Sequence, residues 1–220
     1  MDSHPVKHRT RRKKRRWPVL LLILLVLTLL TVAYVMFRMA GWRGQRTEGT
    51  LTALVNPWNS VDAAGYKPTL VKVRETQVDQ SCSAALEQML RDCEAAGNAP
   101  VLAGGYISRG DLERSRSLSL ENAEPGFSEH ETGLAVDIQD RNSPNDAQSA
   151  VTLWLRDNAW RYGFILRYPD GTEEITGMAP CPWHYRYVGE AAASQIHQLN
   201  ITLEEYVTMF YNDSAAVVFE

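Results

Sequence analysis

Cysteine is scarce in this 220-residue chain, which contains only Cys82, Cys93 and Cys181. With three cysteines, at least one thiol must stay outside any internal disulfide. Cys82 and Cys93 fall in a stretch with helical apolar spacing, where a helix would separate them by about 16 Å along its axis. A disulfide needs Cα atoms within about 7 Å, so we do not expect these two to pair. Two alternatives remain open: all three cysteines are buried thiols, or Cys82 or Cys93 forms a disulfide with Cys181.

Basic residues are scarce beyond Arg46, where 12 Lys and Arg stand against 25 Asp and Glu. This acidic balance disfavours a nucleic-acid-binding domain. Positive charge is instead concentrated in residues 1–16, which carry eight Lys and Arg and one acid. No repeat or low-complexity tract occurs outside this basic tail. The length is that of one medium domain with an N-terminal appendage.

Charge is absent from residues 17–37. An uncharged run of 21 residues is long enough to cross the roughly 30 Å hydrocarbon core of a bilayer as a helix. It exceeds the apolar region of a cleaved signal peptide, and no clear small-residue cleavage site follows it. We therefore predict a single-pass membrane anchor. Because the tail before it is the more basic flank, the N-terminus is expected in the cytoplasm and the remaining chain outside the cell membrane.

The chain beyond the anchor is predicted to form a linker over residues 38–53 and an α+β domain over residues 54–220. Apolar runs bounded by turn residues predict strands at 70–73, 101–106, 133–139, 164–168 and 183–188, with a return pairing at 174–176. Helical spacing predicts helices at 81–96, 147–162, 190–199 and 203–211. Short turns between strands and helices in blocks favour an antiparallel sheet with flanking helices.

Residues 128–138, SEHETGLAVDI, place His130 shortly before a largely apolar strand and Asp137 within it. Side chains alternate between the faces of a strand, so Asp137 would lie opposite a core face made by Leu134, Val136 and Ile138. A carboxylate there is costly to bury without a charged or metal partner. His184 follows Asp137 by 47 positions, and two histidines with one carboxylate are a usual ligand set for catalytic zinc. Spacing alone also allows an exposed aspartate with structural histidines.

Two stretches resemble the motifs of the VanY-type D-alanyl-D-alanine carboxypeptidases, zinc peptidases of bacterial cell walls. The first motif, S-x-H-x-x-G-x-A-x-D, is matched at every position by Ser128, His130, Gly133, Ala135 and Asp137. Residues 182–189 match the second motif, P-W-H-x-R-Y-V-G, and the resemblance runs from about residue 54 to 208. It implies Zn²⁺ held by His130, Asp137 and His184. It also implies removal of the terminal D-alanine from peptidoglycan stem peptides that end in D-Ala-D-Ala.

The sequence departs from this family at Cys181, where the resemblance implies a glutamate that acts as general base. A thiol is a poor substitute, because its unperturbed pKa is near 8.5. Three explanations remain open. Another carboxylate could act as the base, the domain could bind zinc and wall peptides without efficient hydrolysis, or Cys181 could ligate zinc or form a disulfide. The candidate carboxylates are those of Glu129, Glu131, Glu173 and Glu174. A scaffold without metal is a further alternative.

A second departure is Ile107, where the resemblance implies an arginine that holds the C-terminal carboxylate of the substrate. Arg109 would share the face of Ile107 in a strand and could replace this clamp, or it could be a solvated loop residue. Tyr106 and Trp183 are further candidates for substrate binding. Ser128 is expected to order the loop around His130 or to contact the substrate. No Ser-His-Asp arrangement gives Ser128 a nucleophilic role.

Overall fold

The computed structural model describes residues 25–32, 50–117 and 124–211, in two separate units that divide after Gln45. In the first unit, residues 25–32 form a helix with exposed apolar side chains. Within the described ranges, no helix combines the length and the apolar character needed to cross a bilayer. The predicted anchor at residues 17–37 extends past this short helix on both sides, and those flanks lie outside the described ranges, as does the basic tail.

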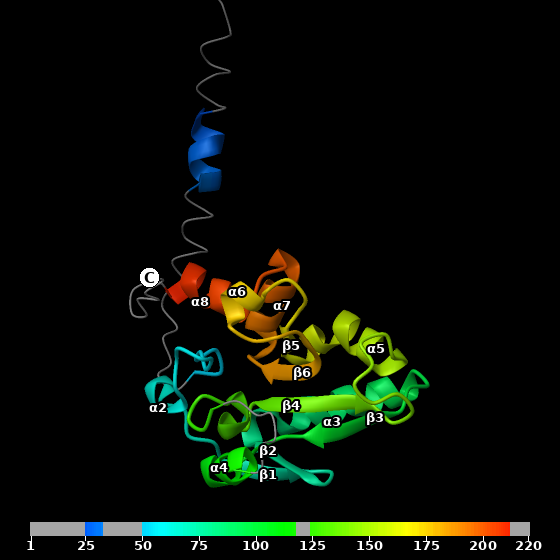
Figure 1. The fold of residues 1–220 in the computed structure, drawn as a ribbon. Coiled ribbons are helices and arrows are strands. Elements are labelled where there is room, and N and C mark those ends of the chain that lie inside the picture. Colours follow the sequence, from blue (N-terminus) through cyan, green and yellow to red (C-terminus); the bar gives the residue numbers. More distant parts are fainter. Residues whose placement is uncertain (1–24, 33–49, 118–123, 212–220) are drawn as a thin grey trace, which may run out of the picture. The chain divides into compact units, whose positions relative to one another are not determined.

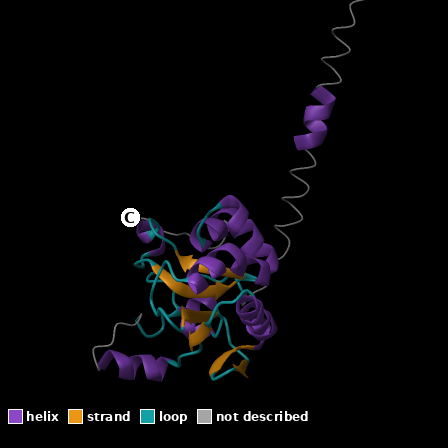
Figure 2. Ribbon diagram, turned by 90° about the vertical axis from the view of Figure 1, so that its right-hand side faces the viewer, coloured by secondary structure: helices purple, strands orange, loops and turns teal. Residues whose placement is uncertain are grey.

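The second unit is built around a four-stranded antiparallel sheet in the order β3-β4-β6-β5. Its strands are β3 (Pro100–Gly104), β4 (Ala135–Asp140), β5 (Phe164–Tyr168) and β6 (Cys181–Tyr187). A separate antiparallel hairpin pairs β1 (Leu70–Val73) with β2 (Thr76–Asp79). Figure 2 shows the strands between helices. The predicted α+β class with an antiparallel sheet and flanking helices is confirmed.

The helices of this unit alternate with the strands along the chain, and α7 and α8 follow the last strand, β6 (Figure 1). Three of them follow residues whose side chains accept a hydrogen bond from the first turn, Ser60 before α2, Asp79 before α3 and Ser149 before α5, which is the usual N-cap arrangement. The α-helices are α2 (Val61–Ala64), α3 (Gln80–Ala95), α4 (Arg109–Ser117), α5 (Ala150–Asn158), α6 (Glu173–Thr176), α7 (Glu190–Leu199) and α8 (Leu203–Tyr211). Two 3₁₀ helices are η1 (Glu129–Thr132) and η2 (Ala159–Tyr162).

The two faces of the sheet have different roles. On one face, Val136, Ile138 and Tyr185 pack into the main apolar core against α3 and α5. The opposite face carries Asp137, together with its cross-strand partner His184. A second apolar cluster joins Ile165 to α7 and α8 beside that face. The alternation predicted for the strand around Asp137 is therefore confirmed. The apolar face packs into the core, and the opposite face carries the polar side chains Asp137 and His184.

Several local predictions were wrong. Residues 174–176 lie in helix α6 rather than in a returning strand. Arg109 begins helix α4, so the strand face that it was to share with Ile107 does not exist. Strand β2 was not predicted. Its partner β1 was predicted. The two-residue turn between these strands, Arg74–Glu75, contains no glycine to indicate a hairpin, although Arg74 adopts a positive φ of 52°. All three cysteines are free thiols, two of them buried, so the bridges to Cys181 left open above do not form.

Candidate active site

Strand register brings the three predicted metal ligands together. Asp137 on β4 lies directly opposite His184 on β6, and η1 presents His130 beside them. One ligand atom from each of the three side chains lies within 4.8 Å of the other two. The two imidazole rings meet edge to face, with centroids 4.9 Å apart. Residues at two distant places in the sequence thus converge on one point of the polar sheet face.

Hydrogen bonding determines which nitrogen of His130 is available at this point. Its Nδ1 lies 2.7 Å from the carbonyl oxygen of Gly105, which can only accept, so Nδ1 carries the proton. The lone pair of neutral His130 is then on Nε2, which lies 3.4 Å from Asp137 Oδ2. A backbone carbonyl behind a histidine is a common outer partner in metal sites, because it fixes the ring orientation and the tautomer.

The glycine pair at the end of β3, Gly104 and Gly105, leaves room for these groups. A Cβ on Gly104 would lie 2.8 Å from Asp137 Oδ2, and a Cβ on Gly105 would lie 2.5 Å from the carbonyl oxygen of Gln77. Real side chains do not tolerate such approaches, so glycine is required at both positions. The sequence predicted a buried strand with two glycines here but gave neither a function. The only sequence feature that could have indicated a function was the Gly-Gly pair itself. The close approach of these glycines to Asp137 and Gln77 depends on strand register, which the sequence does not show.

The electrostatics favour a carboxylate between two histidines. Burial opposes ionisation of Asp137, but hydrogen bonds from His130 and His184 outweigh it and hold the pKa of Asp137 well below its usual range. Burial likewise opposes the charge on His184, yet its contacts with Asp137 and Glu129 raise its pKa to about 9. His184 Nδ1 lies 2.9 Å from Asp137 Oδ1. Protons on the histidines thus supply the positive charge beside Asp137. A bound divalent cation would supply that charge instead.

The donor set fits a zinc ion. His130 Nε2, an Asp137 oxygen and His184 Nδ1 supply two imidazole nitrogens and one carboxylate, the ligand types that zinc prefers. Three protein ligands leave one tetrahedral position for water or substrate, as in catalytic zinc sites. Cys181 is not part of this group of three among the described residues.

Cys181 begins β6, and its half-buried thiol feels the charge of Asp137. Burial, followed by that charge, raises the pKa of the thiol to about 11. The thiol is therefore protonated at neutral pH and is a weak general base.

Two of the carboxylates considered as replacement bases are already engaged. Glu129 is buried and accepts hydrogen bonds from Arg167 and Arg186. Glu131 is buried and accepts from the Gly126 backbone N–H and from Arg109. The other two, Glu173 and Glu174, lie exposed on α6.

The four predicted substrate-binding residues differ in their surroundings. The Arg109 guanidinium donates to Glu131 at 2.9 Å and to both oxygens of Asp62 at 3.0 and 3.1 Å, so it is already neutralised by two carboxylates. Ser128 is buried immediately before η1. Tyr106 and Trp183 are half-buried, the first just after β3 and the second in β6 next to His184. A substrate-binding role for these four residues stays a prediction.

Residues 75–190 match the family model VanY, described as D-alanyl-D-alanine carboxypeptidase. The matched segment contains all three candidate ligands and Cys181. The chain belongs to the VanY family. A D-alanyl-D-alanine carboxypeptidase of Enterococcus faecalis is 34% identical over 185 residues, covering 75% of this chain and 68% of that protein. The matched part of a Bacillus subtilis relative is 55% of its length, so this VanY-family chain spans only part of its curated relatives.

Solved VanY structures share the fold. VanYB in complex with D-Alanine-D-Alanine is 32% identical with a TM-score of 0.63, over 74% of this chain and 98% of the other. A mutant of the vancomycin-resistance D,D-pentapeptidase VanY from a VanB-type resistance cassette, in complex with Zn(II), is 33% identical with a TM-score of 0.62. That match covers 73% of this chain and 99% of the other. These relatives are D,D-peptidases, which confirms the family predicted from the two motifs.

Proposed function

We propose that this chain is a zinc-dependent D-alanyl-D-alanine carboxypeptidase that removes the terminal D-alanine from peptidoglycan stem peptides. The convergence of His130, Asp137 and His184 on one point of the sheet gives the strongest support. Membership of the VanY family supports the substrate class, since one solved relative holds D-Alanine-D-Alanine and another holds Zn(II).

His130, Asp137 and His184 would hold the zinc, which when bound polarises the scissile carbonyl and lowers the pKa of its water. The chain's own residues set the geometry of this step. Gly105 directs His130 Nε2 inward, and the β4–β6 register directs Asp137 and His184 to the same place. Trp183, next to His184, and Tyr106, just after β3, would border a peptide bound there.

The proton transfers are the weak point of this active site. Hydrolysis needs a group that takes a proton from water and delivers it to the leaving amine. With the pKa of Cys181 at about 11, its thiol holds its proton at neutral pH. We therefore propose a slow enzyme, in which Cys181 or an exposed carboxylate such as Glu173 or Glu174 performs this transfer inefficiently.

We further propose that residues 17–37 anchor the protein in the cytoplasmic membrane, with the basic tail inside and residues 54–220 outside. The uncharged run of 21 residues and the preceding positive charge support this arrangement. An extracytoplasmic domain of this kind would meet the peptide stems of the cell wall directly.

The experiment that tests the activity uses the full-length protein purified in detergent. It is incubated with a peptide that ends in D-Ala-D-Ala, and with the same peptide lacking the last residue, while D-alanine is measured. We expect D-alanine release from the first peptide that stops on chelation and returns with Zn²⁺. A protein that contains one zinc per chain and binds the peptide, but releases nothing, would instead be a binding member of the family. Absence of bound zinc would contradict both possibilities.

A further inference from the structure

Glu129 immediately precedes the ligand His130 in sequence, but its carboxylate faces the other histidine ligand. The side chain is 1% exposed. Its Oε1 accepts from Arg167 Nε and from Arg186 Nη1, each at 2.8 Å. Its Oε2 lies 3.4 Å from Nε2 of His184. One oxygen is therefore committed to arginine, and the other is directed at a candidate ligand.

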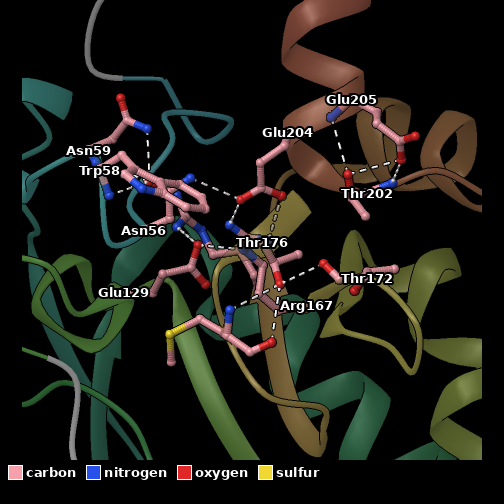
Figure 3. A network of polar contacts seen from close by, with 12 residues as sticks. Asn56, Trp58, Asn59, Glu129, Arg167, Thr172, Thr176, Thr202, Glu204 and Glu205 are labelled. Carbon is pink, nitrogen blue, oxygen red and sulfur yellow. Dashed lines mark hydrogen bonds and ion pairs between the residues drawn. The ribbon is translucent and has the colours of Figure 1, made fainter. Parts of the chain in front are cut away.

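The position of Glu129 is fixed by a buried polar network that joins distant parts of the unit (Figure 3). Arg167 on β5 also donates to Glu204 of α8 at 2.9 and 2.6 Å, and Asn56 donates to Glu204 at 3.1 Å. Arg186 on β6 donates to two backbone carbonyls before α2, those of Leu51 and Ala53.

Two carboxylates and two guanidiniums balance in charge within this network. A buried carboxylate that is paired and fully hydrogen-bonded stays ionised and cannot easily move. The two arginines hold the Glu129 carboxylate from one side, and His184 approaches it from the other.

This arrangement selects the tautomer of His184. An ionised carboxylate only accepts hydrogen bonds, so His184 Nε2 must carry the proton that faces Glu129. Neutral His184 then has its lone pair on Nδ1, the atom that lies 2.9 Å from Asp137 Oδ1. His130 shows the reverse arrangement, with Nδ1 bound to Gly105 and Nε2 directed at Asp137. The outer contacts of both rings thus direct their free nitrogens to the same carboxylate.

We propose that Glu129 is a positioning residue, which orients His184 and holds it in the tautomer that ligates zinc through Nδ1. This inference rests on the proposed zinc site and adds to it a residue that would not touch substrate. It also removes Glu129 from the candidate general bases, because both of its oxygens are committed within the network. Carboxylate–histidine–metal arrangements of this type typically contribute 10- to 100-fold to metal affinity.

The test shortens Glu129 while keeping its charge, so that the two arginines remain paired. In full-length Glu129→Asp the carboxylate retracts by one methylene and loses contact with His184 Nε2. Glu204→Asp is the matched control, because it makes the same change in the same network, on the side of Arg167 away from His184. Zinc dissociation constants are measured by chelator competition, below the thermal transition of each variant.

We expect zinc binding to weaken about 10- to 100-fold in Glu129→Asp and to stay near the wild-type value in Glu204→Asp. Equal affinity in Glu129→Asp and wild type would overturn the positioning role. So would equal weakening in both variants, since the network would then act only through general stability. If the wild-type protein itself binds no zinc, the proposed function fails, a result distinct from either of these.

A second measurement needs no variant and so decides the matter even if Glu129→Asp does not fold. Nitrogen-15 histidine spectra of the zinc-loaded wild-type protein report the protonated nitrogen of each ring. We expect a slowly exchanging proton on Nε2 of His184, because that nitrogen is buried against Glu129, and zinc on Nδ1. Zinc on Nε2 of His184, or rapid exchange of its ring proton, would contradict the proposal.

Discussion

On the proposed function, replacing Cys181 by glutamate should raise the rate of D-alanine release. Burial and the nearby charge of Asp137 raise the pKa of the Cys181 thiol to about 11. At pH 7 roughly one thiol in 10⁴ is then ionised, whereas an exposed glutamate, with a pKa of about 4.3, is almost fully ionised. The variant Cys181→Glu would thus place an ionised base where the present residue is protonated.

The expected gain follows from what a positioned base contributes. General acid–base catalysis typically contributes 10²- to 10⁴-fold, which corresponds to about 3–5 kcal/mol of barrier. Part of this gain is offset, because a second carboxylate near Asp137 is repelled by it and has its own pKa raised. A moderately raised pKa still leaves the glutamate ionised at pH 7. We therefore expect kcat/KM for a D-Ala-D-Ala peptide to rise by about 10²-fold or more.

The assay measures D-alanine release by wild type, Cys181→Glu and Cys181→Gln, each with its zinc content determined. Cys181→Gln is the matched control, since it has the shape of glutamate without a base. We expect the gain only in Cys181→Glu, with zinc content equal in all three proteins. If the glutamate and glutamine variants have the same kcat/KM, the missing base does not limit this enzyme. A loss of zinc in Cys181→Glu would show that residue 181 acts through the metal instead.

Three further outcomes are expected. Asp137→Asn removes the charged ligand, so it should weaken zinc binding by more than the 10- to 100-fold typical of residues that only orient a ligand. Chelator competition measures this affinity, and an unchanged value would mean that zinc binds elsewhere. Burial and the hydrogen bond to Asp92 raise the pKa of Tyr162 to about 12, so that bond stabilises the fold below pH 10 and is lost as the pH rises toward 12. Tyr162→Phe should accordingly lower the Tm at pH 7 and show little difference from wild type near pH 12, and a difference that persists there would refute this assignment. The full-length protein should stay with membranes after an alkaline carbonate wash. The double variant Leu25→Arg/Leu29→Arg should be released by this wash, because each arginine costs about 2.5–3.5 kcal/mol at the centre of a membrane helix. Equal retention of both proteins would argue against the anchor.

Sequence alone predicted the parts of this fold that depend on local periodicity. Helices α7 and α8 and strands β1 and β5 lie at the predicted residues, because apolar side chains at a regular period recur along each of them. Alternation along β4 also placed Asp137 on the face away from the core. The ligand set needed more than periodicity, since the residue types suggested joining His184 to the first stretch and the family motifs then supported it.

The rest of the site depends on contacts that leave no local pattern. Glu129 meets Arg167 and Arg186 across 38 and 57 positions, and no spacing rule connects them. A buried charge in a predicted strand indicates that a partner exists but does not identify it. Helix α6 was missed for a related reason, because a four-residue helix is too short to show a helical period. Sequence thus predicted the ligands better than the residues that hold them.

Residue 181 lies three positions before His184, and the pairing of β6 with β5 is irregular between them. Side chains three apart on a regular strand point to opposite faces. Between the pairs Leu166–Tyr185 and Tyr168–Cys181, however, β6 contains two more residues than β5. Pro182 lies in this segment and cannot donate a ladder hydrogen bond, which is typical of bulged strands near active sites.

Beyond this irregular segment, Cys181 lies close enough to Asp137, the cross-strand partner of His184, for that charge to help raise the pKa of the thiol. The backbone N–H groups of Trp183 and His184 also approach the thiol and partly offset the rise in its pKa. The same N–H groups would stabilise a carboxylate at this position. The backbone around residue 181 is therefore arranged for an anion, which a glutamate would supply and the protonated thiol does not.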